Sequence, residues 1–165
     1  MSDANRHSNF VTEGKLIAQV AEVLRTHHLK LAVAESCTGG ALGKACTDLA
    51  GSSQWFAGGI IAYSNKLKES LLHVESNVLR DFSAVSEEIS IAMCAGVLRS
   101  IPEANIAAAV SGNAGPTGEP QGLVWLAVQK SGGIAQAQRL QVRGSRAMVR
   151  EQAVEAMLKL ILLRA

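Results

Sequence analysis

The chain has 165 residues, of which 48% are hydrophobic and 18% charged, and its formal net charge is +2. This balance is typical of one globular domain with a sizeable core, and it excludes a disordered chain or a protein that coats nucleic acid through excess basic charge. Only 4% of the residues are aromatic, with Tyr63 the single tyrosine. A platform for stacking single-stranded nucleic acid is therefore not expected, and we expect no nucleic-acid partner.

The cysteines and the N-terminal segment bear on localisation. Cys37, Cys46 and Cys94 match neither a CxxC metal site nor a disulfide framework, which favours free thiols in a reducing compartment. Residues 1–10 are polar and lack the apolar core of a signal peptide, and no apolar run reaches the roughly 18 residues of a membrane helix. We expect one cytoplasmic domain over residues 1–165, with 1–10 as a flexible arm, no membrane partner and no metal.

Hydrophobic spacing and turn residues predict an α/β protein. The expected elements are a helix from Thr12, a strand at 29–35, a short buried helix at 41–49, a strand at 59–64, helices at 65–72 and 86–100, a strand at 105–111, strands at 123–129 and 134–142, and a helix at 145–163. Ser131, Gly132 and Gly133 indicate a hairpin between the last two strands. The predicted fold is a three-layer α/β/α sandwich with a mixed, mostly parallel sheet and one antiparallel hairpin.

In such sheets ligands bind at the carboxyl ends of the parallel strands, here the loops after Ala34, Tyr63 and Val110. The first loop, "ESCTGG", offers hydroxyls and backbone N–H groups at the start of a predicted helix, a setting that suits an anion or an oxyanion. Alternatively, Ser36 caps the helix and the glycines allow tight packing. A Walker-type phosphate loop is excluded because no lysine follows the glycines in the required position.

A nucleophilic Ser36 or Cys37 needs a base. The four histidines do not provide one, because they lie in the N-terminal segment, at the end of the first helix, or beyond the helix after Tyr63: His7, His27, His28 and His73. Helical spacing places Lys68 between Leu71 and Leu72 in an apolar arc, whereas Lys66 projects away. A buried lysine with a lowered pKa can accept a proton, although a lysine in this position can also extend its amine into solvent.

Two further features suggest a ligand at this edge of the sheet. The loop "SGNAGPTGEPQG" contains four glycines, Gly112, Gly115, Gly118 and Gly122. They allow backbone N–H groups to approach a ligand closely. Alternatively, the segment is a long surface turn. Arg143, Arg146 and Arg150 cluster at the start of the last helix, where cations are unfavourable to the helix dipole. A bound phosphate would offset that unfavourable interaction, as would solvent exposure.

Five segments, in order and at similar spacing, resemble the CinA C-terminal domain family: "AESCTGG", "GSSQWFAGGIIAYSNKLK", "AVSEE", "SGNAGPTGEPQGLVWLAV" and "GSRAMVR". The resemblance covers nearly the whole chain. The best-defined activity of that family is that of nicotinamide-nucleotide amidases (PncC), which hydrolyse the carboxamide of nicotinamide mononucleotide to nicotinate mononucleotide and ammonia. Longer CinA proteins carry a molybdopterin-binding-like domain before this region, so we expect a stand-alone version.

The resemblance implies a serine amidase that needs no cofactor or metal. Ser36 would attack the amide, Lys68 would accept its proton and Tyr63 would relay or orient. Backbone donors around Thr38, Gly39 and Gly40 would stabilise the oxyanion. The implied substrate-binding residues are Thr38, Gly39, Gly40, Ser111, Gly112, Asn113, Ala114, Gly115 and Arg146, the last as a phosphate partner. A small nucleotide substrate and a homo-oligomer are also implied.

Three positions depart from the family pattern. Asn113 replaces an isoleucine, the loop from Gly115 to Gly122 is short and has "EPQG" in place of "KPVG", and Ser145 replaces the aspartate of "GDR". These departures, with Glu119, keep open an inactive or altered-specificity paralogue that binds nucleotides or a partner. A separate alternative is a thiol enzyme that uses Cys37, whose place near a helix N-terminus can lower its pKa.

Overall fold

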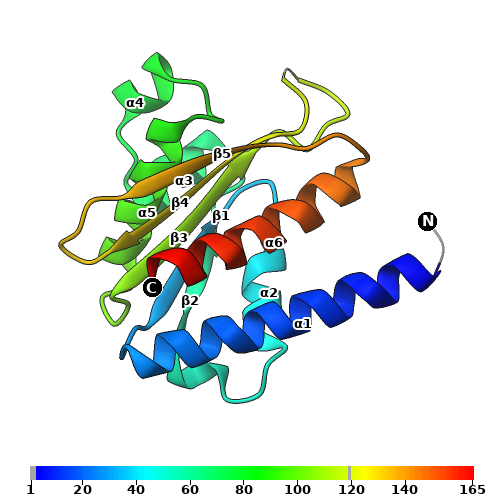
Figure 1. Ribbon diagram of the computed structural model, residues 1–165. Helices are drawn as coiled ribbons and strands as arrows, with labels where there is room; N and C mark the ends of the chain where they lie inside the picture. The colour runs from blue at the N-terminus through cyan, green and yellow to red at the C-terminus, as the bar shows by residue number, and fades with distance from the viewer. Residues whose placement is uncertain (1–2, 119) are drawn as a thin grey trace.

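The computed structural model describes residues 3–118 and 120–165, with side chains from residue 14 onward. Figure 1 shows the order of its elements. They are α1 (Asp3–Thr26), β1 (Leu31–Glu35), α2 (Ala41–Thr47), the 3₁₀ helix η1 (Ser52–Gln54), β2 (Phe56–Ile61), α3 (Asn65–Leu72), α4 (Ser76–Asp81), α5 (Glu87–Ser100), β3 (Ile106–Gly112), β4 (Leu123–Lys130), β5 (Gln136–Gln141) and α6 (Arg146–Arg164).

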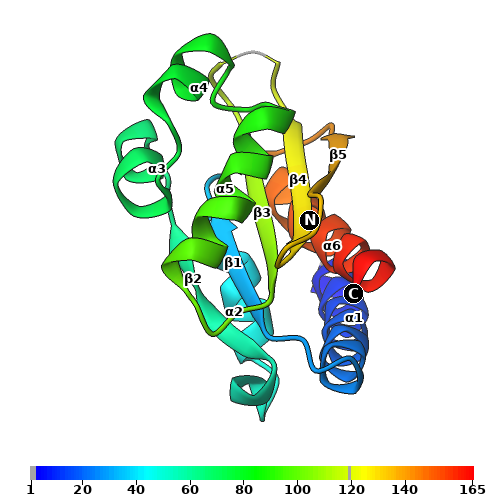
Figure 2. The same ribbon diagram turned by 90° about the vertical axis from the view of Figure 1, so that its left-hand side faces the viewer.

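One five-stranded sheet in the order β2-β1-β3-β4-β5 forms the middle layer. Strand β1 pairs in parallel with β2 and β3, whereas β4 is antiparallel to both β3 and β5, so every strand except β4 runs the same way. Helices α1, α2 and α6 lie on one side of the sheet and α5 on the other, with α3 and α4 packed against α5 (Figure 2). The predicted three-layer sandwich is confirmed.

The two faces of the sheet bury side chains of different size. Along β1, Leu31 and Val33 contribute to the core beneath α1 and α6, while Ala32 and Ala34 face the core beneath α5. This alternation is the period of two that a strand imposes. The alanines of β1 and β3 make the α5 face shallow, so α5 can pack close to the strand ends.

Three predictions of secondary structure are corrected. Residues 3–10 form the first turns of α1, although we expected an arm there and a helix start at Thr12; residues 1 and 2 lie outside the described part of the chain. The segment before Thr12 contains no glycine or proline, so nothing in it ends the helix. Strand β2 begins at Phe56, earlier than the predicted 59–64, because β1 pairs with it from Leu31 onward. The short helix α4 was missed.

Capping residues set the starts of the three helices that border the strand ends. The hydroxyl oxygens of Ser64, Ser86 and Ser145 accept hydrogen bonds from the backbone N–H three residues later, at the starts of α3, α5 and α6 respectively. All three helix starts agree with those predicted from the sequence. Each cap satisfies one N–H group that has no partner within its helix.

A glycine allows α3 and α5 to come together. A Cβ atom added to Gly96 of α5 would lie 2.1 Å from the backbone oxygen of Leu72, at the end of α3. Backbone atoms cannot move aside as the end of a flexible side chain can. The approach of α3 to α5 therefore depends on the missing side chain at this position.

We predict that Gly96→Ala lowers the free energy of unfolding by about 1–3 kcal/mol, because the added methyl group forces the two helices apart. Chemical denaturation followed by circular dichroism measures this change. Gly14→Ala in α1 is the control, since no atom lies within 4 Å of a Cβ built there. The better helix propensity of alanine should leave that variant as stable as the natural protein or stabilise it by up to about 1 kcal/mol. A stable Gly96→Ala variant would contradict this account.

Candidate active site

Ser36 and Ser111 lie side by side at the carboxyl ends of two parallel strands. Ser36 follows β1, is 6% exposed, and donates its backbone N–H to the Val110 oxygen at 3.0 Å. The register pairs Glu35 with Val110, so the next residues along, Ser36 and Ser111, are neighbours. Strand alternation carries both side chains to the α5 face, after Ala34 and Ala109 respectively.

The side chain of Lys68 is buried on the inner face of α3. Its side chain is on the same helix face as Leu72, four residues later, and both are at most 2% exposed, while Lys66 is exposed. The inward direction predicted for Lys68 is confirmed. The apolar arc used to predict it is partly wrong, because Leu67 and Leu71 are 37% and 44% exposed. Lys68 lies on the face of α3 that packs against α5.

Desolvation lowers the pKa of Lys68 below its ordinary value of 10.5. Burial disfavours the charged ammonium because little water remains to solvate it. Negative charge on Cys37 would act in the opposite sense, but burial keeps that thiol protonated near neutral pH. Lys68 forms no ion pair with any residue in the part of the chain that the structure describes. The amine is therefore available in its neutral form at lower pH than a surface lysine.

A backbone carbonyl joins Lys68 to Ser111. The oxygen of Ala84, between α4 and α5, accepts hydrogen bonds from the Ser111 hydroxyl at 2.7 Å and from the Lys68 amine at 3.4 Å. The Lys68 amine thus bonds to Ala84 and not to Ser36. Within the described residues the Ser36 hydroxyl has no hydrogen-bond partner. This leaves the Ser36 hydroxyl free to interact with a ligand or with a lysine that turns from Ala84.

Two arginines of α6 tie the loops of the site together. Arg146 donates to the Gly115 carbonyl oxygen at 2.7 Å and to the Tyr63 hydroxyl at 3.4 Å. Arg150 donates to the Thr38 carbonyl oxygen at 2.7 Å. Loops that follow β1, β2 and β3 are therefore held by one helix. The predicted conflict between these cations and the helix dipole is relieved by carbonyl acceptors.

The predicted substrate-binding residues gather at the same edge of the sheet with differing exposure. Thr38, Ser111, Ala114 and Gly115 are buried, Gly40, Gly112 and Asn113 are partly buried, and Gly39 and Arg146 are exposed. The predicted catalytic Tyr63 is 61% exposed at the rim.

Backbone spacing is tight where the first and third loops meet. A Cβ atom at Gly112 would lie 2.9 Å from the sulfur of Cys37, so this position requires glycine. In the same loop, the Asn113 side-chain oxygen accepts the backbone N–H of Gly115 at 2.9 Å.

Glu35, which the sequence analysis did not single out, changes the interpretation of the loop 36–40. Its side chain is 1% exposed and accepts the N–H groups of Gly40, Leu42 and Gly43 at 2.9, 3.2 and 2.7 Å. The start of α2 is thereby occupied, so we no longer count the Gly40 N–H as an oxyanion donor. A carboxylate that closes an apolar strand just before a glycine-rich turn was the signal that could have revealed it.

Two backbone N–H groups of the loop 36–40 remain free. Gly39 donates to the Ser36 oxygen at 3.2 Å, Gly40 to Glu35 and Ser36 to Val110. The N–H groups of Cys37 and Thr38 follow Ser36 directly in the chain and have no backbone acceptor among the described residues.

Cys37 is unsuited to act as a nucleophile. Burial raises the pKa of its thiol to about 11, although its own backbone N–H and then Arg150 act in the opposite direction. Burial likewise raises the pKa of Cys46 to about 12 and that of Cys94 further still. All three thiols are buried and free. At neutral pH they are protonated, and a thiol enzyme based on Cys37 is disfavoured.

We therefore predict that the native protein resists thiol reagents. With a pKa near 11, only about one Cys37 in a thousand is ionised at pH 8, and the side chain is 4% exposed. Titration with dithionitrobenzoate should label less than about 0.2 thiols per chain within minutes in buffer. All three cysteines of the chain should react in guanidinium chloride. Rapid labelling of native Cys37 would contradict the burial described above.

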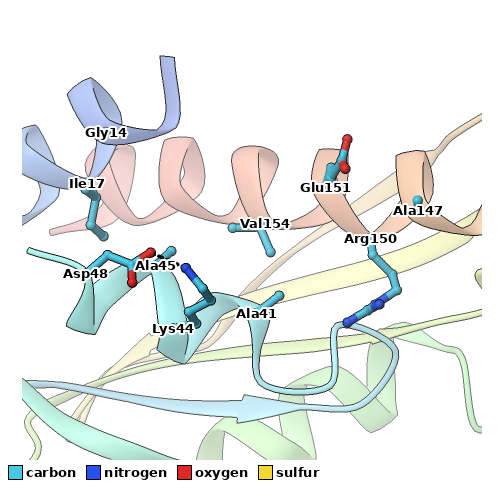
Figure 3. Close-up of a pocket in the computed structure, with 10 residues that line it drawn as sticks. All are labelled: Gly14, Ile17, Ala41, Lys44, Ala45, Asp48, Ala147, Arg150, Glu151 and Val154. Atoms are coloured by element: carbon cyan, nitrogen blue, oxygen red, sulfur yellow. Dashed lines mark hydrogen bonds and ion pairs between the residues drawn. The ribbon is translucent and has the colours of Figure 1, made fainter. Parts of the chain in front are cut away.

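A separate groove of about 360 Å³ lies between α1, α2 and α6 (Figure 3). Its lining residues are Gly14, Ile17, Ala41, Lys44, Ala45, Asp48, Ala147, Arg150, Glu151 and Val154. Ser36, Lys68 and Ser111 do not line this groove. Arg150 does, and its guanidinium points from the groove toward the loop 36–40, where it donates to the Thr38 oxygen. We therefore place the candidate site on the α5 side of the sheet and not in this groove.

Within the described residues, no cluster of three histidine, cysteine, aspartate or glutamate side chains could hold a metal ion. No helix in that part of the chain is long and apolar enough to cross a membrane.

The sequence profile of the CinA C-terminal domain matches residues 13–164. The chain belongs to the CinA C-terminal domain family. It is similar to the protein named nicotinamide-nucleotide amidohydrolase PncC from Enterobacter agglomerans, with 40% identity over 84% of this chain and 87% of the relative. The protein of the same name from Escherichia coli strain K12 is 38% identical over 84% of this chain and 86% of the relative.

Other CinA-related proteins are longer or are known as solved structures. A putative competence-damage inducible protein of Desulforamulus reducens is 38% identical over 92% of this chain, which spans only 37% of that relative. The competence damage-inducible protein A from Klebsiella pneumoniae has a crystal structure that matches with a TM-score of 0.88 and 35% identity, over 92% of this chain and 96% of that one. The CinA fold is therefore shared along almost the whole described chain.

Proposed function

We propose that this CinA-family chain is an amidohydrolase that converts nicotinamide mononucleotide into nicotinate mononucleotide and ammonia. The observation that carries the proposal is the buried, partly desolvated Lys68, next to Ser111 through the Ala84 carbonyl, with Ser36 on the neighbouring strand end. The names of relatives that this chain matches over more than four fifths of both lengths support the choice of substrate.

In the proposed reaction, the Lys68 amine in its neutral form turns from Ala84 and takes the proton of the Ser36 hydroxyl. The Ser36 oxygen bonds to the carboxamide carbon, and the carbonyl electrons move onto the substrate oxygen. The free N–H groups of Cys37 and Thr38 stabilise that oxyanion. When the C–N bond breaks, Lys68 returns the proton to the leaving nitrogen and ammonia departs. Water, deprotonated by Lys68, then attacks the ester, and nicotinate mononucleotide leaves as Ser36 is reprotonated.

The rest of the site would bind the nucleotide. Ser111 and the loop 112–115 would line the pocket next to Ser36, and Thr38 belongs to the loop that carries Ser36. Arg146 is exposed at the rim, where it donates to Gly115 and Tyr63 and retains further N–H donors for a phosphate. Tyr63 would orient the pyridine ring or relay protons beside it.

The alternative is a paralogue that binds nucleotides without hydrolysing them. Two of the departures that raised it have local roles that do not touch the proposed chemistry. Asn113 closes a turn through Gly115, and Ser145 caps α6 as an aspartate would. Residue 119 lies outside the described part of the chain. A cytoplasmic location and a homo-oligomer stay predictions.

We predict that the purified protein releases ammonia from nicotinamide mononucleotide and that Ser36→Ala lowers kcat by at least about 10³-fold, because the nucleophile is lost. A coupled glutamate dehydrogenase assay measures the ammonia. Cys37→Ser serves as the control and should keep most of the activity. No ammonia release by the natural protein, together with a nucleotide-induced rise in melting temperature, would favour the non-catalytic alternative.

The pH dependence should follow Lys68. Because the neutral amine is the base, kcat/KM should increase with pH through the lowered pKa of Lys68 and then level off below the usual lysine range. Lys68→Arg keeps the charge but cannot be deprotonated, so activity should decrease about 10²–10⁴-fold at every pH. Identical pH profiles for the natural protein and a still active Lys68→Arg variant would exclude Lys68 as the base.

The same pKa shift predicts a stability change. Since the folded pKa lies below the unfolded one, Lys68 binds more proton in the unfolded chain between the two values, and its contribution to the free energy of unfolding should increase with pH in that window. The three cysteines, whose pKa is raised by burial, contribute with the opposite sign, so the effect of Lys68 is the difference in slope between the natural protein and a Lys68 variant. Lys68→Met should reduce that slope. Urea denaturation between pH 7 and 10.5 measures it, and an equal slope in both proteins would contradict the desolvation of Lys68.

A further inference from the structure

Glu35 is a buried carboxylate whose charge has no cationic partner among the described residues. It is 1% exposed, and no salt bridge of the described chain includes it. One oxygen, Oε2, accepts the N–H groups of Gly40 and Leu42, and Oε1 accepts that of Gly43. Burying a carboxylate is unfavourable unless hydrogen bonds compensate for lost water. Three charge-assisted bonds from one short segment supply that compensation here.

These bonds determine which amides of the loop 36–40 stay free. Glu35 accepts the N–H groups of Gly40, Leu42 and Gly43. The Gly39 N–H donates to the Ser36 oxygen and the Ala41 N–H to the Thr38 oxygen. From the other side, Arg150 takes the Thr38 carbonyl. The loop is thus held at Thr38 and at Gly40. The N–H groups of Cys37 and Thr38 are left without a backbone acceptor among the described residues.

The Glu35 carboxylate itself does not face the reacting atoms. Strand alternation sends Glu35 and Ser36 to opposite faces of β1, and the hydrogen bonds of Glu35 confirm that it points to α2. Any effect of Glu35 on catalysis therefore passes through the backbone of the loop.

We propose that Glu35 is a positioning residue that holds the loop 36–40 so that the N–H groups of Cys37 and Thr38 stabilise the oxyanion formed on Ser36. The inference rests on the proposed amidase function. It adds a residue that contributes to the transition state without touching substrate. Because the oxyanion exists only after Ser36 attacks, loss of Glu35 should lower kcat and leave binding of the ground-state nucleotide almost unchanged.

Glu35→Gln tests this proposal. The shape is retained, but the new NH₂ group cannot accept an N–H, so at least one of the three amides loses its partner. We expect kcat to decrease about 10²-fold and KM to change by less than about threefold. Glu35→Asp keeps the charge on a side chain one methylene shorter. Its kcat should lie between those of Glu35→Gln and the natural protein, which gives a second reading if Glu35→Gln folds poorly.

Two controls separate positioning from a general loss of folded protein. Cys46→Ala also alters buried packing in α2 but has no hydrogen bond to the loop 36–40, so it should keep kcat while lowering the melting temperature. Calorimetric titration of nicotinamide mononucleotide into Ser36→Ala, with and without Glu35→Gln, should give the same stoichiometry and the same Kd within about threefold.

The inference is overturned if Glu35→Gln keeps kcat within twofold, if its loss of kcat equals a loss of binding stoichiometry, or if Cys46→Ala loses as much activity. In these cases the natural protein still releases ammonia, so the proposed function is retained. If the natural protein releases no ammonia, the proposed function fails and this inference fails with it.

Discussion

The burial of the Lys68 amine is the constraint on which the rest of the site depends. A lysine in water is a poor base near neutral pH because its proton is held too tightly, and removing water weakens that hold. The same burial opposes folding whenever the amine is charged, so the surrounding layers have to favour the folded state. The shallow alanine surface of β1 and β3 and the close contact at Gly96 serve that purpose by letting α5 and α3 seal the strand ends.

Helix α6 gives the site its shape from the opposite layer. It is the last helix of the described chain, and its first two turns carry Arg146 and Arg150. Arg146 binds the oxygen of Gly115, 31 residues earlier in the sequence, and Arg150 binds that of Thr38, 112 residues earlier. Guanidinium groups suit this role because each carries several fixed donors and stays charged. The carbonyl oxygens that they bind become part of one rigid rim. The loops after β1, β2 and β3 are thereby coupled through a single helix.

Much of the fold followed from patterns that short-range physics makes visible. Local residue patterns indicated the starts of α3, α5 and α6, where the structure has serine caps, and apolar runs indicated β1 and β3, because these signals lie within a few residues of the feature they specify. The start of α1 and the extent of β2 were missed, since they depend on the absence of a stop signal and on pairing with β1. Helical spacing did orient Lys68 inward beside the buried Leu72, although two other leucines of the apolar arc, Leu67 and Leu71, are 37% and 44% exposed.

The site was less predictable than the fold. Ser36, Lys68 and the glycine loop could be named because their residue types are unusual where they occur. The family resemblance pointed to backbone donors around Thr38, Gly39 and Gly40. However, the N–H groups of Gly39 and Gly40 are paired and that of Cys37 is not, because these contacts depend on Glu35 and on the path of the loop. Donors and acceptors of the backbone are present at every position, so only geometry distinguishes the ones that matter.

The Ala84 carbonyl illustrates what this means for comparing relatives. It bonds both the amine of Lys68 and the hydroxyl of Ser111, yet almost any amino acid at position 84 would offer the same oxygen. Selection can therefore act on the length and path of the connection between α4 and α5 while its amino acids are free to vary. Insertions or deletions in that connection, more than substitutions, should mark family members in which the amine rests in a different place.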